Sequence, residues 1–327
     1  MGRYVLRRIL GMIPTLAIIS VISFVLIQLP PGDIVTSTLA DLEQQGQQVT
    51  EERIAALRAM YHLDDSIPVQ YLRWAGNFLT GNLGYSIRYQ QPVSRLIWER
   101  IFLTVVIAMA SILFTWVIAI PAGILSAVRQ YSATDYSLTV LALLGMATPN
   151  FMLALVMMYL GYEWFGISVG GLFSPDFVDA PWSLARIGDL LKHVWVPMVI
   201  LGLGGAAGMM RVLRANLLDE LRKPYVVTAR AKGVRPVRLI LKYPVRLAIN
   251  PFISTIGWML PALFSGSAII SVVLDLPTTG PLLLEALMSQ DMYLAGSFIM
   301  ILSTLTVIGT LISDLLLAIV DPRIRYE

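Results

Sequence analysis

The sequence predicts an all-α polytopic membrane protein with six transmembrane helices and a small extracytoplasmic domain between the first two of them. Three observations support this fold class. The chain has 327 residues, of which 57% are hydrophobic and only 14% are charged, which is more apolar surface than a soluble domain can bury. The apolar residues gather in runs of about 20, the length that one membrane-spanning helix needs. The basic residues gather in a few of the segments between these runs.

Six apolar runs are long enough to be membrane helices. The first follows Arg3, Arg7 and Arg8 and could be mistaken for a secretory signal. Its apolar stretch is too long for the hydrophobic part of a signal, and no small-residue cleavage site follows it, so we expect a retained helix. The six expected spans are Ile9–Leu29, Phe102–Val128, Leu138–Phe165, Val194–Leu213, Ile249–Val273 and Tyr293–Val320.

The charges of the connecting segments predict the orientation. With the N-terminus inside, the inner segments hold sixteen Lys and Arg residues and five acids, whereas the outer segments hold eight Lys and Arg residues and fifteen acids. The reverse orientation would invert the bias that places basic residues on the cytoplasmic side. We therefore expect both termini in the cytoplasm.

The predicted spans divide the chain into four parts. Residues 1–29 form a cytoplasmic tail and the first membrane helix, and residues 30–100 form the extracytoplasmic domain. Residues 101–320 form the transmembrane core with helices two to six, which includes a cytoplasmic loop at 214–247. Residues 321–327 form a second cytoplasmic tail. Nothing in the extracytoplasmic part resembles a catalytic constellation.

The segment Arg211–Arg246 is strongly basic, with ten Lys and Arg residues against two acids. Pro224 suits the first turn of a helix, where its missing N–H costs nothing. Gly233 suits the end of that helix, because glycine readily adopts the left-handed backbone that other residues resist. Ala229 and Ala231 allow a partner surface to come close. The pattern predicts a knob that fits a cleft on another protein; the simpler alternative is basic bias with lipid contact.

Motifs along nearly the whole chain resemble one family, the permease subunits of ABC importers, in the dipeptide and oligopeptide ("B-type") group that works with a binding protein. Five motifs occur in the family's order, although Asn82 stands where an Asp is usual. They are Leu6-Arg7-Arg8-Ile9-Leu10 with Pro14, Pro31-Gly32-Asp33, Pro68-Val69-Gln70-Tyr71-Leu72-Arg73-Trp74 with Gly81-Asn82-Leu83-Gly84-Tyr85-Ser86, Tyr225–Gly233 with Asn250-Pro251, and Asp321-Pro322-Arg323-Ile324-Arg325-Tyr326.

The resemblance implies a type I importer permease fold in a bacterial or archaeal inner membrane. It implies four kinds of partner: a second permease subunit (usually a paralogue), two P-loop ATPase subunits, an extracytoplasmic solute-binding protein and membrane lipid. It implies no nucleic acid. ATP and Mg would be bound by the ATPase subunits, and this chain would carry no cofactor, metal or catalytic residue. The residues expected to couple to the ATPase are Tyr225, Thr228, Ala229, Arg230, Ala231, Lys232, Gly233 and Val234.

The chain departs from the family pattern in two places. The wider ABC-importer motif begins with Glu-Ala-Ala, whereas this chain has Val227-Thr228-Ala229 at those positions. We therefore expect shape, Arg230 and Lys232 to carry more of the docking. The second departure is Leu276–Pro281, where the family more often has Pro-Gly-Leu-Gly. It is interpreted as a neutral turn variant, with a different solute or binding protein as the alternative.

The solute pathway is expected to be lined by small, uncharged polar residues. A Thr-Pro-Asn sequence in the middle of the third span frees backbone carbonyls and kinks the helix. Packing of small side chains between helices is the alternative for every candidate, as it is for the glycine face at 202–208. The candidates are Ser111, Thr115, Thr148, Pro149, Asn150, Gly257, Ser265 and Ser267.

Other function classes are disfavoured by what the sequence contains. It has no phosphate-binding loop of the Gly-x4-Gly-Lys-Ser/Thr type, so ATP hydrolysis must come from a partner. An ion-coupled carrier or channel is disfavoured because it needs ionisable groups inside the membrane, and the expected spans contain one clear candidate, Asp314. An intramembrane enzyme is disfavoured because the chain has no cysteine and only two histidines. A signalling or assembly subunit with this fold stays open.

The solute is not determined by this chain, because the binding protein selects it. The resemblance ranks peptides first and oligosaccharides second, and related permeases serve nickel complexes and glutathione.

Overall fold

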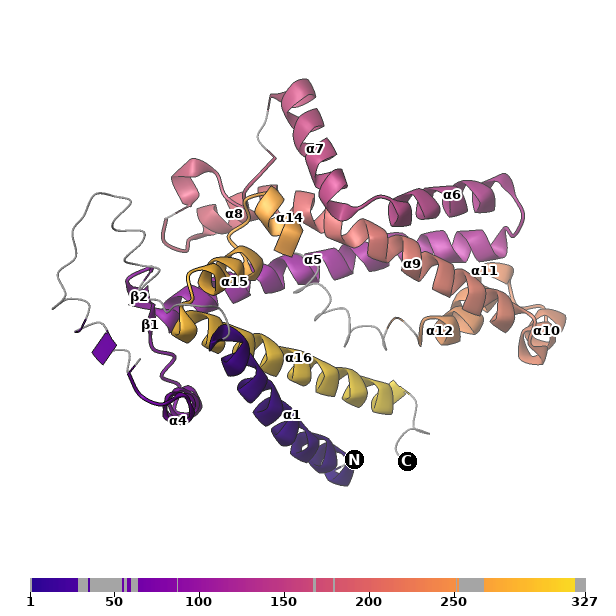
Figure 1. The fold of residues 1–327 in the computed structure, drawn as a ribbon. Coiled ribbons are helices and arrows are strands. Elements are labelled where there is room, and N and C mark those ends of the chain that lie inside the picture. Colours follow the sequence, from indigo (N-terminus) through magenta and orange to yellow (C-terminus); the bar gives the residue numbers. More distant parts are fainter. Residues whose placement is uncertain are drawn as a thin grey trace. The chain divides into compact units, whose positions relative to one another are not determined.

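The computed structural model of the chain describes residues 2–28, 35, 55, 58–59, 64–86, 88–166, 169–178, 180–250, 252 and 268–320, without the side chains of residues 2–6, 165 and 313–320. The described part is mainly helical (Figure 1). The chain divides into two compact units. The first comprises Met1–Leu103 and Thr278–Leu311, and the second comprises Thr104–Pro277 and Ile312–Glu327.

Four helices of the described part are long and apolar enough to cross a membrane. They are α1 (Gly2–Gln28), α5 (Val93–Val128), α9 (Trp195–Leu221) and α16 (Met292–Val320). They confirm apolar helices at the first, second, fourth and sixth expected spans. The expected span Ile249–Val273 lies mostly outside the described residues, which include its end as α14 (Ala268–Val273), so the total of six stays a prediction.

The third expected span is two helices rather than one. α6 (Ala133–Ala147) and α7 (Asn150–Phe165) are bent by 99° at the break between them. Pro149 precedes the first residue of α7 and has an extended backbone, with φ −60° and ψ 134°. Proline has no N–H to continue the α6 ladder and disfavours helical backbone in the residue before it. The kink predicted at Thr148-Pro149-Asn150 is therefore confirmed.

In the first unit, an aromatic cluster joins the segment after residue 64 to the membrane helices. α4 (Ile67–Leu79) carries Tyr71 and Trp74, whose ring centroids lie 5.4 and 5.9 Å from that of Phe24 in α1. The buried indole of Trp74 also lies against Gly296 of α16, where a Cβ would come within 3.1 Å of it. Part of the predicted extracytoplasmic domain is thus packed on helices of its own unit.

Polar contacts fix the rest of this segment to the first unit. β1 (Tyr85–Ser86) and β2 (Gln91–Pro92) form a short antiparallel hairpin. The buried Ser86 hydroxyl donates to the Asp291 carboxylate over 2.6 Å, and Asp291 also accepts the N–H of Leu294 at the start of α16. Arg88 and Tyr89 both donate to Glu285 of α15 (Thr279–Met288). Burial and Glu285 raise the pKa of Tyr89, which therefore stays a neutral donor.

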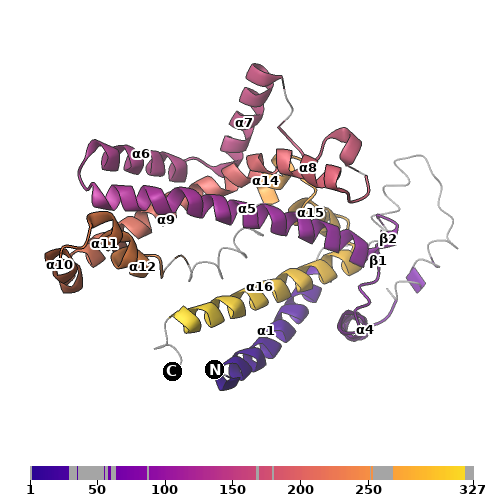
Figure 2. The same ribbon diagram turned by 180° about the vertical axis from the view of Figure 1, so that it is seen from behind.

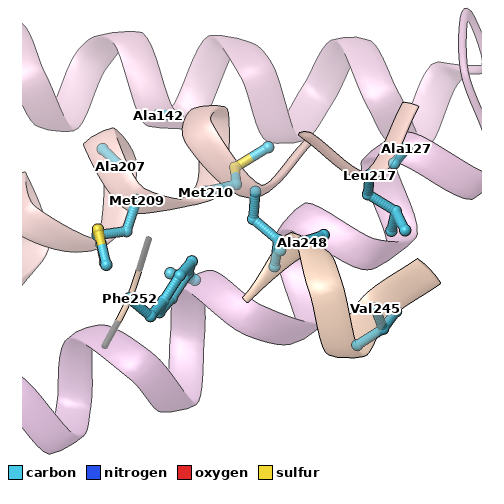
Figure 3. Close-up of a cluster of buried hydrophobic side chains, with 12 residues drawn as sticks. Ala127, Ala142, Ala207, Met209, Met210, Leu217, Val245, Ala248 and Phe252 are labelled. Atoms are coloured by element: carbon cyan, nitrogen blue, oxygen red, sulfur yellow. The ribbon is translucent and has the colours of Figure 1, made fainter. Parts of the chain in front are cut away.

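In the second unit, α9 runs beside α6, and three short helices gather near its C-terminal end (Figures 1 and 2). These are α10 (Pro224–Ala231), α11 (Pro236–Lys242) and α12 (Pro244–Ala248). The unit also contains η1 (Pro175–Phe177) and α8 (Leu184–His193). Buried side chains of α5, α6, α9 and α12 form one hydrophobic core with Phe252, drawn in Figure 3.

The glycine face of α9 makes a close helix contact at Gly202 in this structure. A Cβ on Gly202 would lie 2.7 Å from Cδ1 of Phe114 and 3.0 Å from the carbonyl oxygen of Ser111, both in α5. The hydroxyl of Thr115 donates to the Gly202 carbonyl over 3.0 Å, and that of Ser111 donates to the Ile107 carbonyl over 2.8 Å. Ser111 and Thr115, expected as pathway candidates, are buried and take part in helix packing.

We expect Gly202→Ala to destabilise the protein by about 1–3 kcal/mol, because the added methyl overpacks the contact with α5. Gly208→Ala is the matched control, since nothing lies within 4 Å of a Cβ at that position of the same helix. Thermal unfolding of the purified protein in mild detergent measures the difference. Equal unfolding temperatures for the two variants would contradict the close contact.

Candidate coupling site

The residues predicted to couple to an ATPase lie together on α10 and on the turn that follows it. The helix begins at Pro224, preceded by Lys223 with an extended backbone. Proline suits this first position, and the N–H of Val226 donates to the Lys223 carbonyl over 3.0 Å. The side chain of Val226 is fully buried. It holds one side of this short helix on the second unit.

The end of α10 is held by the backbone of Gly233, which has φ +74°. The N–H of Gly233 donates to the Arg230 carbonyl over 3.0 Å, and the N–H of Val234 donates to the Ala229 carbonyl over 3.3 Å. These two bonds are those of a Schellman motif, which satisfies the last carbonyls of a helix. The prediction that Gly233 ends the helix in a left-handed conformation is confirmed.

The outer side of this element is a small exposed surface, which we call the α10 tip. Val227, which stands where the wider motif has Glu, is 59% exposed. The surface at this position is therefore apolar rather than acidic. Tyr225, Ala229 and Val234 are half-buried beside it. The α10 tip consists of Val227, Thr228, Arg230, Ala231, Lys232 and Gly233, all of them exposed.

A carboxylate at the end of α9 ties α10 to that helix. Glu220 accepts hydrogen bonds from Lys223 Nζ and from the Tyr225 hydroxyl, both over 2.6 Å. Burial and this hydrogen bond raise the pKa of Tyr225 to about 12. The phenol therefore stays protonated near neutral pH and keeps donating to Glu220. A displacement of α10 would pull on the C-terminal end of α9 through these bonds.

Farther along α9, a buried ion pair joins three helices of the second unit. Arg214 Nε and Nη2 donate to the two carboxylate oxygens of Asp135 in α6, each over 2.8 Å. The same carboxylate accepts the Ser126 hydroxyl of α5 and, over 2.9 Å, the N–H of Tyr131. Two-pronged Arg–carboxylate pairs are stronger and more directional than single hydrogen bonds. α9 is therefore fixed to both α5 and α6 near the end that carries α10.

Sequence reasoning did not identify Asp135 or Arg214. Arg214 was counted only as one of many basic residues, and its partner lies 79 residues away in the chain. One local signal exists, because Ser132 precedes α6 and its hydroxyl accepts the N–H of Asp135. That Ser-x-x-Asp pattern indicates a helix start, but it gives no hint of the arginine.

Three of the five described pathway candidates lie at the break between α6 and α7, and the other two, Ser111 and Thr115, belong to α5. Thr148 and Asn150 are half-buried and Pro149 is exposed. The Thr148 hydroxyl donates to the Leu144 carbonyl over 2.8 Å, which satisfies a group at the end of α6. Gly204 of α9 lies near this break, since a Cβ there would be 3.8 Å from Oδ1 of Asn150. The other candidates, Gly257, Ser265 and Ser267, lie outside the described residues, as does the side chain of Asp314.

Comparison with known proteins gives two matching family models. One, described as "Binding-protein-dependent transport system inner membrane component", matches residues 119–326. The other, described as the N-terminal part of a binding-protein-dependent transport system membrane component, matches residues 1–110. Together they cover nearly the whole chain.

Several curated proteins are similar over their full lengths. A putative peptide permease protein of Brucella ovis is 36% identical over 331 residues, with 99% of each chain covered. The oligopeptide transport system permease protein AppB of Bacillus subtilis is 35% identical over 328 residues, with 100% of each chain covered. A solved structure of the MetNI methionine ABC transporter in an inward-facing conformation has a TM-score of 0.54 and 17% identity, covering 70% of this chain and 98% of the other. At that identity the likeness shows the fold alone.

Proposed function

The chain belongs to the family of binding-protein-dependent transport system inner membrane components, and from that premise we propose that it forms half of the solute pathway of an ATP-driven importer. The family resemblance found in the sequence motifs is confirmed by the family models and the full-length relatives. The chain is a multi-pass permease subunit of the inner membrane. The other half of the pathway is proposed to be a second permease subunit, usually a paralogue in this family.

The observation that carries the coupling proposal is the construction of α10. It presents an exposed tip, while the buried Val226 and the bonds to Glu220 hold it on the second unit and the Schellman turn fixes its end. An element with a free surface and a rigid base can receive a force from a partner and pass it on. We assign the partner as an ATPase subunit, with a cleft that receives the α10 tip.

The energy for transport is proposed to come from two such ATPase subunits, which bind ATP and Mg. The chain itself has no phosphate-binding loop. Closure of the ATPase pair would displace α10, and the Glu220 contacts would carry the displacement into α9. The pair of Arg214 and Asp135 would then move α5 and α6 with α9. This series of contacts supports a conformational change at the break around Pro149.

Peptides are the proposed solutes, because the full-length relatives above are named as peptide and oligopeptide permeases. Oligosaccharides are the second candidate from the motif resemblance. A solute-binding protein is proposed to deliver the solute on the outer face, where residues 30–100 would meet it or cover the exit. Both termini, and α10 with them, are assigned to the cytoplasm on the distribution of basic residues.

Purification of the tagged protein from its own membranes in mild detergent tests this function. We expect a second permease and two P-loop ATPases to elute with it, and solute-dependent ATP hydrolysis by the purified assembly. Peptides tested against oligosaccharides as stimulants of that hydrolysis distinguish the two solute classes. A chain that elutes alone and still moves solute down an ion gradient would contradict the proposal.

A further inference from the structure

Helix α8 has its polar and apolar sides the wrong way round for a helix in water. Arg186 and Asp189 are buried, with only 5% and 7% of their surface exposed. Three large apolar side chains of the same helix face outward instead: Leu184 is 88% exposed, Ile187 is 44% exposed and Leu191 is 65% exposed. Buried charges and an exposed apolar stripe are each unusual for a surface helix and usually have a reason.

The inward side of α8 is held by specific contacts within the second unit. The guanidinium of Arg186 lies between the rings of Phe173 and Trp182, 4.7 and 4.5 Å from their centroids. It also donates to the carbonyls of Val178 and Ala180, over 2.9 and 2.5 Å. A cation held between two aromatic faces and bonded to carbonyls is well compensated for its burial.

Asp189 fixes the same side of the helix one turn later. Its carboxylate accepts both the N–H and the hydroxyl of Ser174, each over 2.7 Å. The next buried side chain on that side is Leu190. α8 therefore cannot rotate to hide its apolar stripe without breaking these contacts, and the stripe is a permanent surface of the folded chain.

The stripe is continuous along the helix. At 100° per residue, positions 184, 187 and 191 fall within about 60° of one another, and positions 186 and 189 lie on the opposite side. Lys192 is exposed at the border of the stripe. A helix with an apolar face, a cationic edge and a short length suits the boundary between water and lipid rather than a span.

The neighbouring elements supply the argument for lipid. α8 is separated by Val194 alone from α9, which is apolar and long enough to cross a membrane. Tryptophan and tyrosine gather where membrane helices meet the head groups. Exposed aromatic residues occur at the end of α7, before α8 and at the start of α9: Tyr162, Trp164, Trp182 and Trp195.

We propose that α8 lies in the membrane–water interface, with Leu184, Ile187 and Leu191 inserted among the lipid acyl chains and Lys192 at the level of the head groups. The occupant of this face is thus the bilayer, and not a second protein. The helix anchors the segment between α7 and α9 to the membrane surface and fixes the level at which α9 enters it. This inference is independent of the solute and of the ATPase proposal.

Spin labels test the proposal directly, because the chain contains no cysteine and single cysteines need no background removal. Labels would be placed at Leu184 and Leu191 on the stripe, at Leu190 on the buried side, and at the exposed Asp176 of η1 as a water control. The protein is purified with its companion subunits and reconstituted in nanodiscs of phosphatidylethanolamine and phosphatidylglycerol. Collision rates with oxygen, which enters lipid, and with a nickel chelate, which stays in water, are measured for each label.

We expect labels at positions 184 and 191 to collide severalfold more with oxygen than with the nickel chelate. The label at 190 should be shielded from both, and the label at 176 should favour the nickel chelate. Nickel access at 184 and 191 equal to that at 176 would overturn the proposal in favour of a solvated face. Shielding of 184 and 191 from both reagents would overturn it in favour of a partner protein.

Discussion

Replacing Gly233 by valine is expected to lower solute uptake about tenfold while the chain still inserts in the membrane. Gly233 has φ +74°, and a non-glycine residue in left-handed backbone costs roughly 1–2 kcal/mol, with β-branched residues strained further. A loss of about 1.4 kcal/mol in the docking conformation corresponds to a tenfold loss of the competent state. Uptake by reconstituted transporter is the measurement.

Gly233→Asn is the matched control for this prediction. Nothing lies within 4 Å of a Cβ at this position, so neither side chain meets a steric obstacle and only the backbone conformation distinguishes them. Asparagine tolerates the left-handed region better than other residues with a side chain. The asparagine variant should keep most of the uptake, and equal activity of the valine and asparagine variants would show that the Schellman turn does not matter for coupling.

Replacing Asp135 by asparagine is expected to have the largest effect on stability. The change leaves Arg214 facing a neutral group in a site where the Asp135 side chain is 3% exposed. Removing one partner of a buried ion pair costs about 3–5 kcal/mol, and the lower end applies because the arginine side chain is 26% exposed. We expect a lower unfolding temperature in detergent, together with reduced uptake.

The double variant with Asp135→Asn and Arg214→Gln distinguishes the effect of an unpaired charge from the effect of losing the ion pair itself. Both groups are then neutral and can still hydrogen bond, so no charge is left without a partner. This variant should recover much of the stability lost in Asp135→Asn, because the penalty comes mainly from the unpaired charge. If the double variant is less stable than the single one, the ion pair does not act as described. Uptake that stays low despite restored stability would show that the directional pair itself transmits movement.

The features that sequence predicted best are those set by neighbouring residues. Pro224 and Gly233 determine the two ends of α10 through their own backbone preferences, and Pro149 breaks the ladder between α6 and α7. Each of these signals acts within one helical turn. Apolar length alone was enough to find α1, α5, α9 and α16.

The features that sequence did not predict depend on residues far apart in the chain. Asp135 and Arg214 are 79 positions apart and carry no shared local pattern. The inward turn of Arg186 depends on two aromatic rings and two carbonyls that only the folded segment brings together. From its sequence alone, α8 would be expected to expose Arg186 and Asp189 to water. The roles of the coupling and pathway residues, and the division into four parts, stay predictions.

The most direct test of the central claim is a photo-crosslink from the α10 tip. A single cysteine at Ala231, which is exposed on α10, is labelled with a short photoreactive reagent in the purified transporter and irradiated with and without ATP. We predict a covalent product with an ATPase subunit from position 231 and none from the exposed position 184 on α8. A transporter whose ATPase subunits are present and active, but which yields no such product from position 231, would contradict the assignment of α10 as the coupling element.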